Sequence, residues 1–221
     1  MSLGVPYKRR GSIFRKTSYF HAIESINLEV YSGETLGVVG RNGSGKSTLL
    51  YLMGNIIKPD SGTIHFNNVS VSLMSIGIGF EPNLSGKDNA IIGGMLQGRT
   101  RREVENNLDA IHEFSELGEF FCEPVRTYST GMRARPGFSV AYIMRPDVLL
   151  LDEILSVGDQ HFKKKDEATM REKISSNQTV VLVSHSPEQP KRLCDRILFL
   201  DSGKNISLGK PEETLSQFPL N

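Results

Sequence analysis

One segment, Gly40–Ser47, constrains this chain more than any other part of its sequence. It reads Gly-Arg-Asn-Gly-Ser-Gly-Lys-Ser and fits the pattern G-x-x-x-x-G-K-[ST] at every position. Glycines at these places let backbone N–H groups curl around a phosphate, and the helix that follows adds the positive end of its dipole. Because the pattern works between a strand and a helix, it predicts an α/β fold of the P-loop type.

The sequence around this segment has the alternation of elements that such a site needs. Thr35–Val39 is a short apolar run typical of a buried strand, and Ser47–Ile57 has leucines at helical spacing. Ile23–Val30 alternates apolar and polar residues and is predicted to be a strand. Lys58–Gly62 is a turn signal, and Thr63–Leu73 alternates again as strand material.

The middle of the chain is predicted to be helical, and its end returns to strands. Ile76–Ser85 is rich in Gly, Pro and Asn, which predicts an exposed loop. The pattern is then helical as far as Gly118 and again over Thr130–Met144. Three apolar strands are predicted, at Val148–Leu151, Val180–Val183 and Ile197–Leu200. This order favours two lobes, with the helical one at about residues 85–145.

Composition limits the class of protein. The 221 residues are 38% hydrophobic and 23% charged, as in ordinary globular proteins, and the formal net charge of +1 gives no indication of nucleic-acid binding. A basic cluster over residues 8–16 is either a solvated face or a contact for nucleotide, lipid headgroups or an acidic partner. No apolar stretch reaches the ~20 residues of a membrane span. Cys122 and Cys194 form no Cys-x-x-Cys pattern, so we expect reduced thiols in a cytosolic protein.

Two acids after an apolar strand provide the second half of the candidate site. Asp152 and Glu153 follow Val148–Leu151, and a buried strand presents such residues at its C-terminal end, where α/β sheets place ligands. Lys46 is expected to reach the β- and γ-phosphates of ATP, and the Ser47 hydroxyl to bind Mg²⁺. Asp152 is expected in the Mg²⁺ shell, and Glu153 is suited to polarise the attacking water as a general base.

Three further motifs make the chain resemble the ATP-binding cassette (ABC) ATPases. Tyr128-Ser129-Thr130-Gly131-Met132 is similar to the family's signature motif, Ser156-Val157-Gly158-Asp159 to its D-loop, and Val183-Ser184-His185-Ser186 to its switch-histidine motif. The resemblance extends from about Tyr7 to Gly209. It implies a single ABC nucleotide-binding domain over residues 1–221, with a P-loop NTPase fold that comprises a RecA-like lobe, an antiparallel β subdomain and a helical subdomain.

The resemblance also implies a mechanism that two copies of the chain share. A homodimer would form head to tail on ATP binding, so that each γ-phosphate meets Lys46 of one subunit and Ser129 and Gly131 of the other. His185 would contact the γ-phosphate and hold the water and Glu153 in register. Closure would depend on ATP, and product release would reopen the dimer. The implied nucleotide contacts are Gly40, Asn42, Gly43, Ser44, Gly45, Lys46, Ser47, Thr48, Tyr7, Ser129 and Gly131.

A longer match narrows the resemblance to one subfamily. Gly79–Asn89, together with the signature and D-loop residues, is similar to the ATPase subunits of bacterial exporters of lipid-linked polysaccharide: O-antigen, capsule and teichoic acid. This implies an ATPase held at the cytoplasmic face of the inner membrane by a transmembrane permease. Many carbohydrate exporters of the O-antigen kind carry a C-terminal sugar-binding domain. Since the sequence ends at Asn221, we expect that domain to be absent or removed.

Other functions fit fewer of the motifs. A soluble ABC ATPase acting on ribosomes or DNA is the alternative, but such proteins usually carry two cassettes in one chain or a long coiled-coil insertion. A P-loop kinase would give the signature motif and His185 no role. Co-purification with a permease rather than with ribosomes would separate the first two.

Two positions depart from the pattern of most ABC ATPases. Glu81 stands where those proteins have a glutamine that touches Mg²⁺, and we assign it to the metal site as the aligned residue. Pro136 lies inside the helix that the signature should start, where an interior proline costs about 3 kcal/mol or more. That helix is therefore expected to be kinked at Pro136, unless the sequence is a variant, and Pro136→Leu is expected to raise the melting temperature.

The resemblance also implies an aromatic residue near the N-terminus that stacks on adenine. Tyr7 fits best because it precedes the first long strand, and Phe14, Tyr19 and Phe20 are rivals for the role. Core packing is the other interpretation of these aromatic side chains. Met1–Pro6 is expected to be too short for the family's usual first strand.

Overall fold

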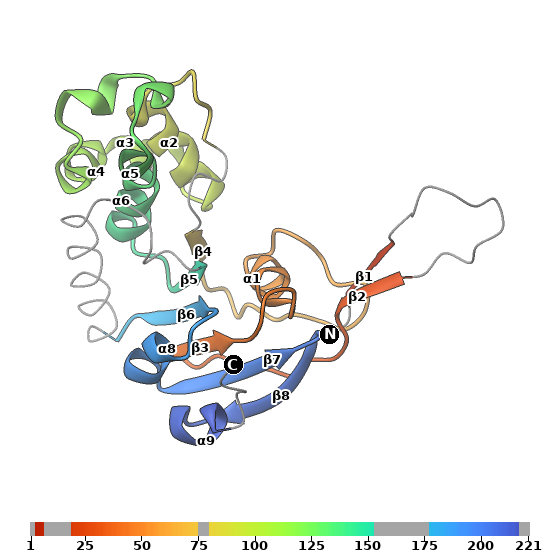
Figure 1. The fold of residues 1–221 in the computed structure, drawn as a ribbon. Coiled ribbons are helices and arrows are strands. Elements are labelled where there is room, and N and C mark those ends of the chain that lie inside the picture. Colours follow the sequence, from red (N-terminus) through yellow and green to blue (C-terminus); the bar gives the residue numbers. More distant parts are fainter. Residues whose placement is uncertain (1–2, 7–18, 75–79, 153–176, 217–221) are drawn as a thin grey trace. The chain divides into compact units, whose positions relative to one another are not determined.

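The computed structural model describes residues 3–6, 19–74, 80–152 and 177–216 and divides the chain into two compact units (Figure 1). Unit 1 comprises residues 1–67 and 181–221, and unit 2 comprises residues 68–180. Several of the predictions concern residues outside the described ranges: Tyr7, Phe14, Glu153 and the D-loop Ser156–Asp159. In the described part of the chain, every helix is too short or too polar to cross a membrane.

Unit 1 contains a sheet with the strand order β6-β3-β7-β8. Two of its strands are buried along their whole lengths: β3 (Thr35–Val39) and β6 (Thr179–Ser184). β6 belongs to unit 1 from Val181 on. β3 pairs in parallel with β7 (Arg196–Asp201), and β7 pairs antiparallel with β8 (Lys204–Gly209). Near-continuous apolar sequence is what strands buried on both faces require, so these predicted strands are confirmed.

Three helices and a hairpin complete the described part of unit 1. α1 (Lys46–Met53) follows β3, α8 (Glu188–Leu193) follows β6, and α9 (Pro211–Leu215) follows β8. α1 ends earlier than predicted, because Gly54 caps it and Asn55 takes a left-handed φ of 55°. The hairpin pairs β1 (Leu3–Pro6) with β2 (Tyr19–Ile23) antiparallel. Met1–Pro6 thus contributes a strand of four residues, although it was expected to be too short for the family's usual first strand.

The strand predicted over Ile23–Val30 is also wrong, since β2 ends at Ile23. From there the chain runs without strand structure, and Ile23 and Ile26 are buried as single side chains. The Glu24 N–H donates to the Gly203 carbonyl, and Ser25 forms an isolated bridge to Lys204. The alternation in sequence thus reflects an irregular segment that buries one side on the sheet. The strand predicted over Thr63–Leu73 is likewise reduced to β4 (Val71–Met74).

Unit 2 is a group of helices beside the parallel pair of β4 and β5 (Val148–Asp152). The longer helices are α2 (Gly86–Leu96), α4 (Leu108–Ser115) and α6 (Arg135–Ile143). Shorter turns of helix lie between them: α3 (Arg101–Glu105), η1 (Gly118–Cys122), η2 (Val125–Thr127) and α5 (Thr130–Arg133). Figure 1 shows these helices gathered into one group. They enclose an apolar core whose buried members include Val104, Ile111, Phe121, Tyr128 and Val140.

The helix predicted over Thr130–Met144 is interrupted. α5 ends at Arg133, Ala134 serves as its cap, and α6 starts at Arg135. Pro136 therefore lies in the first turn of α6, where its missing N–H costs little. The break predicted from Pro136 is confirmed, and it falls two residues before the proline.

Candidate phosphate-binding site

Gly40–Ser47 connects the end of β3 to the start of α1 within unit 1. Arg41, Asn42 and Gly43 are exposed, whereas Ser44 and Lys46 are buried. The Ser44 N–H donates to the Arg41 carbonyl over 3.1 Å, which closes the loop into a tight turn. The segment thus has the strand–loop–helix position that its sequence requires.

Three glycines permit this turn for different reasons. Gly43 and Gly45 have φ values of 79° and 102°, in the left-handed region that side chains disfavour. Gly40 is required by space instead, because a Cβ there would overlap the carbonyl oxygen of Leu200. Positive φ in successive turn residues aims backbone N–H groups into one concavity, the arrangement that binds anions.

Lys46 folds back over the beginning of the loop. Its Nζ donates to the carbonyl oxygens of Gly40 at 2.7 Å and Arg41 at 3.0 Å. The Lys46 side chain is buried, so its positive charge is held at the centre of the turn. A phosphate oxygen could take the place of either carbonyl as the partner of this charge.

The start of α1 is open to an anion. Its N-cap is Gly45, no side chain caps it, and its first turn contains no acidic residue. The first N–H groups of a helix have no partner within the helix, and the dipole makes that end positive. The hydroxyl of Ser44 is buried without a hydrogen-bond partner among the described residues, whereas Ser47 is exposed and Thr48 half-buried in the first turn.

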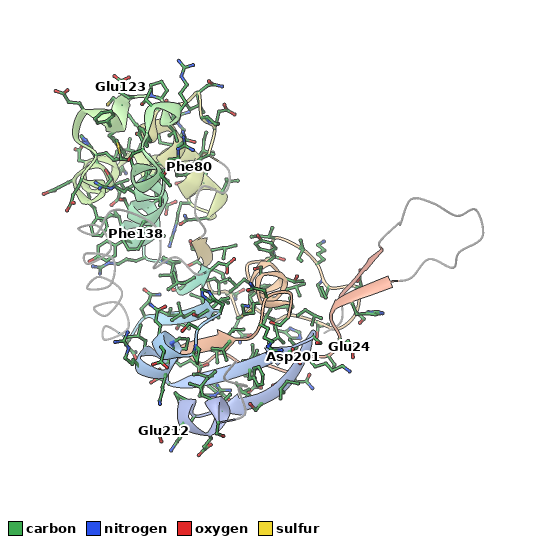
Figure 2. The ribbon with its side chains drawn as sticks, viewed as in Figure 1. Glu24, Phe80, Glu123, Phe138, Asp201 and Glu212 are labelled. Carbon is green, nitrogen blue, oxygen red and sulfur yellow. The ribbon has the colours of Figure 1, made fainter. Side chains whose placement is uncertain are left out.

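A second glycine turn supports the loop and was not identified from the sequence. Gly203, between β7 and β8, donates its N–H to the Ser44 carbonyl over 2.9 Å and has a φ of 76°. A Cβ at Gly203 would approach the Ala22 carbonyl oxygen to 2.7 Å. Figure 2 shows Glu24 and Asp201, which flank these contacts in sequence, at the same side of unit 1. The Asp201-Ser202-Gly203 run between two strands is a turn signal that could have identified it.

The other predicted site residues are divided between the units. His185 belongs to unit 1, is exposed and directly follows β6, the neighbour of β3 in the sheet. Asp152 is the last residue of β5 in unit 2 and is half-buried. The structure thus brings Lys46, Ser47 and the loop together in unit 1, and it places Asp152, Glu81, Ser129 and Gly131 in unit 2.

Glu81 is hydrogen-bonded to two asparagines, neither of which was predicted to belong to the site. Its carboxylate accepts from the Asn83 N–H at 3.2 Å and from Asn83 Nδ2 at 3.0 Å. Its N–H donates to Asn89 Oδ1 at 2.7 Å, and its carbonyl accepts from Asn89 Nδ2 at 3.1 Å. Asn89 also donates to the carbonyls of Leu84 and Ser85 and is fully buried. A buried asparagine with four backbone partners fixes the path of the loop.

The signature motif lies at the start of α5, where Ser129 is exposed. Ser129 caps this helix, and its hydroxyl accepts from the Met132 N–H at 3.4 Å. Thr130 is exposed and Gly131 half-buried. Tyr128, directly before them, is buried in the core of unit 2.

Comparison with known proteins identifies the family to which the chain is similar. A sequence model described as "ABC transporter" matches residues 23–156. The chain is 46% identical to the O-antigen export system ATP-binding protein RfbB of Myxococcus xanthus, over 92% of this chain and 47% of that protein. It is 41% identical to the teichoic acids export ATP-binding protein TagH of Enterococcus faecalis, over 94% and 46%. It is 39% identical to RfbB of Klebsiella pneumoniae, over 96% and 85%.

Solved structures give the same fold. The ATP-binding cassette MJ0796, in a dimeric post-hydrolysis state bound to ADP and Pi, superposes with a TM-score of 0.76 at 20% identity, over 95% of this chain and 96% of that one. The chain spans about half the length of the first two relatives named above and most of the third. The predicted α/β P-loop fold is therefore confirmed, and the chain belongs to the ABC transporter family.

Proposed function

We propose that this chain is the ATP-binding and ATP-hydrolysing subunit of an ABC exporter that moves lipid-linked polysaccharide across the bacterial inner membrane. The observation that carries the proposal is the 39% identity to an O-antigen export ATP-binding protein of which the chain covers 85%. Relatives named for teichoic acid export support the same class of cargo, a glycan polymer. These names favour export over the alternative of a soluble ABC ATPase acting on ribosomes or DNA.

The glycine loop supports ATP as the ligand. Its backbone N–H groups and the amine of Lys46 would bind the β- and γ-phosphates, and the amine would exchange the Gly40 and Arg41 carbonyls for phosphate oxygens. The Ser44 hydroxyl, which has no hydrogen-bond partner among the described residues, and the uncapped start of α1 offer further donors. Asn42 and Thr48 complete the nucleotide contacts proposed in unit 1, and Tyr7 is proposed to stack on adenine.

The oxygen groups that we assign to Mg²⁺ are of the type this ion prefers. The Ser47 hydroxyl is exposed in the first turn of α1, and Asp152 ends a strand with a carboxylate. Glu81 is the weaker candidate, because its carboxylate already accepts two bonds from Asn83. Mg²⁺ bound by these residues would neutralise phosphate charge during transfer.

Hydrolysis is proposed to need two copies of the chain. Ser129 and Gly131 of a second copy would contact the γ-phosphate held by Lys46, and His185 would keep the attacking water in place. The Glu153 carboxylate would accept the proton of that water as the new bond to the γ-phosphorus forms and the bond to ADP breaks. We further propose that residues 1–221 act as one nucleotide-binding domain, bound to a transmembrane permease at the cytoplasmic face of the membrane.

Glu153→Gln tests this proposal in the full chain. The variant keeps the size of the side chain but cannot take a proton, so ATP turnover should fall by about a hundredfold or more. ATP-induced dimerisation, followed by size-exclusion chromatography, should remain. Lys46→Ala is the matched control and should lose both ATP binding and dimerisation. Retained hydrolysis in Glu153→Gln would refute Glu153 as the base, and a wild-type protein that neither binds nor hydrolyses ATP would refute the function.

A further inference from the structure

Tyr128 occupies an unusual position directly before the exposed signature residues. Its side chain is 3% exposed in the core of unit 2, whereas Ser129 is exposed. Its backbone is extended, with dihedrals of the polyproline II type (φ −75°, ψ 140°), so successive side chains point in different directions. The chain therefore presents Ser129 outward at the point where Tyr128 is anchored inward.

The phenol of Tyr128 contacts two other elements. Its hydroxyl donates to the Phe120 carbonyl of η1 at 2.6 Å and lies against Gly86, the first residue of α2. Burial raises the pKa of this phenol to about 12, so it stays a neutral donor at any physiological pH. A Cβ at Gly86 would overlap the phenol oxygen, which means that this glycine is required by Tyr128 and not by a positive φ.

The backbone at and just before the start of α2 is also hydrogen-bonded to the segment that leads to Tyr128. The Gly86 N–H reaches the carbonyl of Glu123, a residue labelled in Figure 2 at the surface of unit 2. The N–H groups of Val125 and Arg126 donate to the carbonyls of Leu84 and Pro82, both at 2.9 Å. The loop that carries Glu81 and the segment that leads to Tyr128 are thus hydrogen-bonded to each other.

The signature segment has little support from helix structure of its own. α5 is four residues long, and helices this short are unstable by themselves. It is separated from α6 by the break at Ala134. Ala134 keeps helical dihedrals (φ −79°, ψ −24°), so what the chain lacks between α5 and α6 is continuous helical hydrogen bonding to support Ser129.

We propose that Tyr128 is a positioning residue for the signature motif. Its buried phenol ties the segment before Ser129 to η1 and to the start of α2, in place of the continuous helix that is interrupted before Pro136. The inference rests on the proposed function, because the aim of Ser129 matters only if the residue meets the ATP of a second copy. Tyr128 itself touches no nucleotide.

Tyr128→Phe in the full chain removes the hydroxyl and keeps the ring. Ser115→Ala is the matched control: Ser115 is also fully buried in unit 2, and its hydroxyl donates to a backbone carbonyl at 2.7 Å and accepts from a backbone N–H. Both changes should lower the melting temperature to a similar degree. Hydrogen exchange of the Met132 and Arg133 amides, both bonded to the Ser129 carbonyl, should accelerate about five- to tenfold in Tyr128→Phe alone.

Kinetics separate positioning from a general loss of stability. Tyr128→Phe should lower kcat for ATP about five- to tenfold and weaken ATP-induced dimerisation, while the ATP affinity of the monomer stays unchanged. Exchange rates and kcat equal to those of Ser115→Ala would overturn the inference and leave the function intact. A wild-type protein without ATPase activity would overturn the proposed function, and the exchange data would still show whether Tyr128 anchors the segment.

Discussion

The glycine loop of unit 1 and the signature segment of unit 2 are both short turns that start a helix, but they are held in opposite ways. The loop is held mainly by its own backbone and by Lys46, whose amine bonds two of the loop carbonyls, with one further bond from the Gly203 N–H to the Ser44 carbonyl. The signature segment is held by a neighbour, since Tyr128 is buried among other elements while Ser129 is exposed. A turn shaped by its own residues leaves a local pattern in the sequence, and a turn shaped by distant packing does not.

The largest effect is expected where the loop has no freedom to adjust. In Gly45→Ala, the new Cβ would overlap the Ala22 carbonyl, and a φ of 102° is strained for alanine by about 1–3 kcal/mol. We expect ATP affinity to fall by more than about a hundredfold and the melting temperature to drop by several degrees. Isothermal calorimetry and thermal unfolding measure the two effects.

Gly93→Ala is the control for Gly45→Ala. Gly93 lies inside α2, and a Cβ there would meet no atom within 4 Å. Alanine should stabilise the helix by about 0.5–1 kcal/mol and leave ATP binding unchanged. If both variants bind ATP like the wild type, the loop is not shaped by its glycines, and the contrast between the two turns fails.

A second prediction concerns the loop that carries Glu81, which is held from outside like the signature segment. Asn89→Ala leaves one N–H and three carbonyls of residues 81–85 without their side-chain partner. The three carbonyls keep their bonds from backbone N–H groups, and the loss of the four side-chain hydrogen bonds should destabilise the protein by about 1–3 kcal/mol in urea denaturation. Because Asn89 is in unit 2, the ATP affinity of the glycine loop should change little.

Asn83→Ala tests whether the internal contacts of the same loop matter as much. Asn83 is exposed, and its side-chain amide donates to the Glu81 carboxylate at 3.0 Å. We expect a loss of less than about 0.5 kcal/mol, as for most surface substitutions. Equal losses in the Asn83 and Asn89 variants would mean that the loop shapes itself.

The fold was predictable where burial leaves a simple pattern. The apolar runs at Thr35–Val39 and Val148–Leu151 identified β3 and β5, because strands buried on both faces are apolar at every position. The strand predicted over Ile23–Val30 was wrong, because an irregular segment buried on one side gives the same alternation of apolar and polar residues as a half-buried strand. The pattern of burial was correct there, and the backbone that produced it was not a strand.

The residues of the candidate site were predictable where they belong to a recognisable motif. The loop residues follow from one contiguous motif, and the signature, Asp152 and His185 follow from a family resemblance. Asn89 and Tyr128 were recognised only as members of motifs and Gly203 was missed. The roles of Gly203 and Tyr128 depend on segments distant in sequence, Gly203 on Ser44 and Tyr128 on Gly86. Contacts of this kind appear only when the chain has folded.

The last prediction concerns Pro136, where the structure reduces the expected cost from the ~3 kcal/mol of an interior proline. Pro136 is buried in the first turn of α6. Leucine would restore an N–H that can bond the Met132 carbonyl and join α5 to α6, whereas losing proline makes the unfolded chain more flexible and opposes the gain. We expect a net rise in melting temperature of about 2–4 °C, which corresponds to about 1 kcal/mol.

Pro211→Leu provides the matched control, because Pro211 also begins a helix, α9, but follows no helical segment. Its replacement restores no helical hydrogen bond and should lower stability by about 0.4–1 kcal/mol. If Pro136→Leu behaves like Pro211→Leu, α5 and α6 are separate helices whatever residue lies between them, and the proline did not cause the break. If it raises stability as expected, a joined helix should support Ser129 from behind. Tyr128→Phe should then cost less turnover when it is combined with Pro136→Leu than when it is made alone.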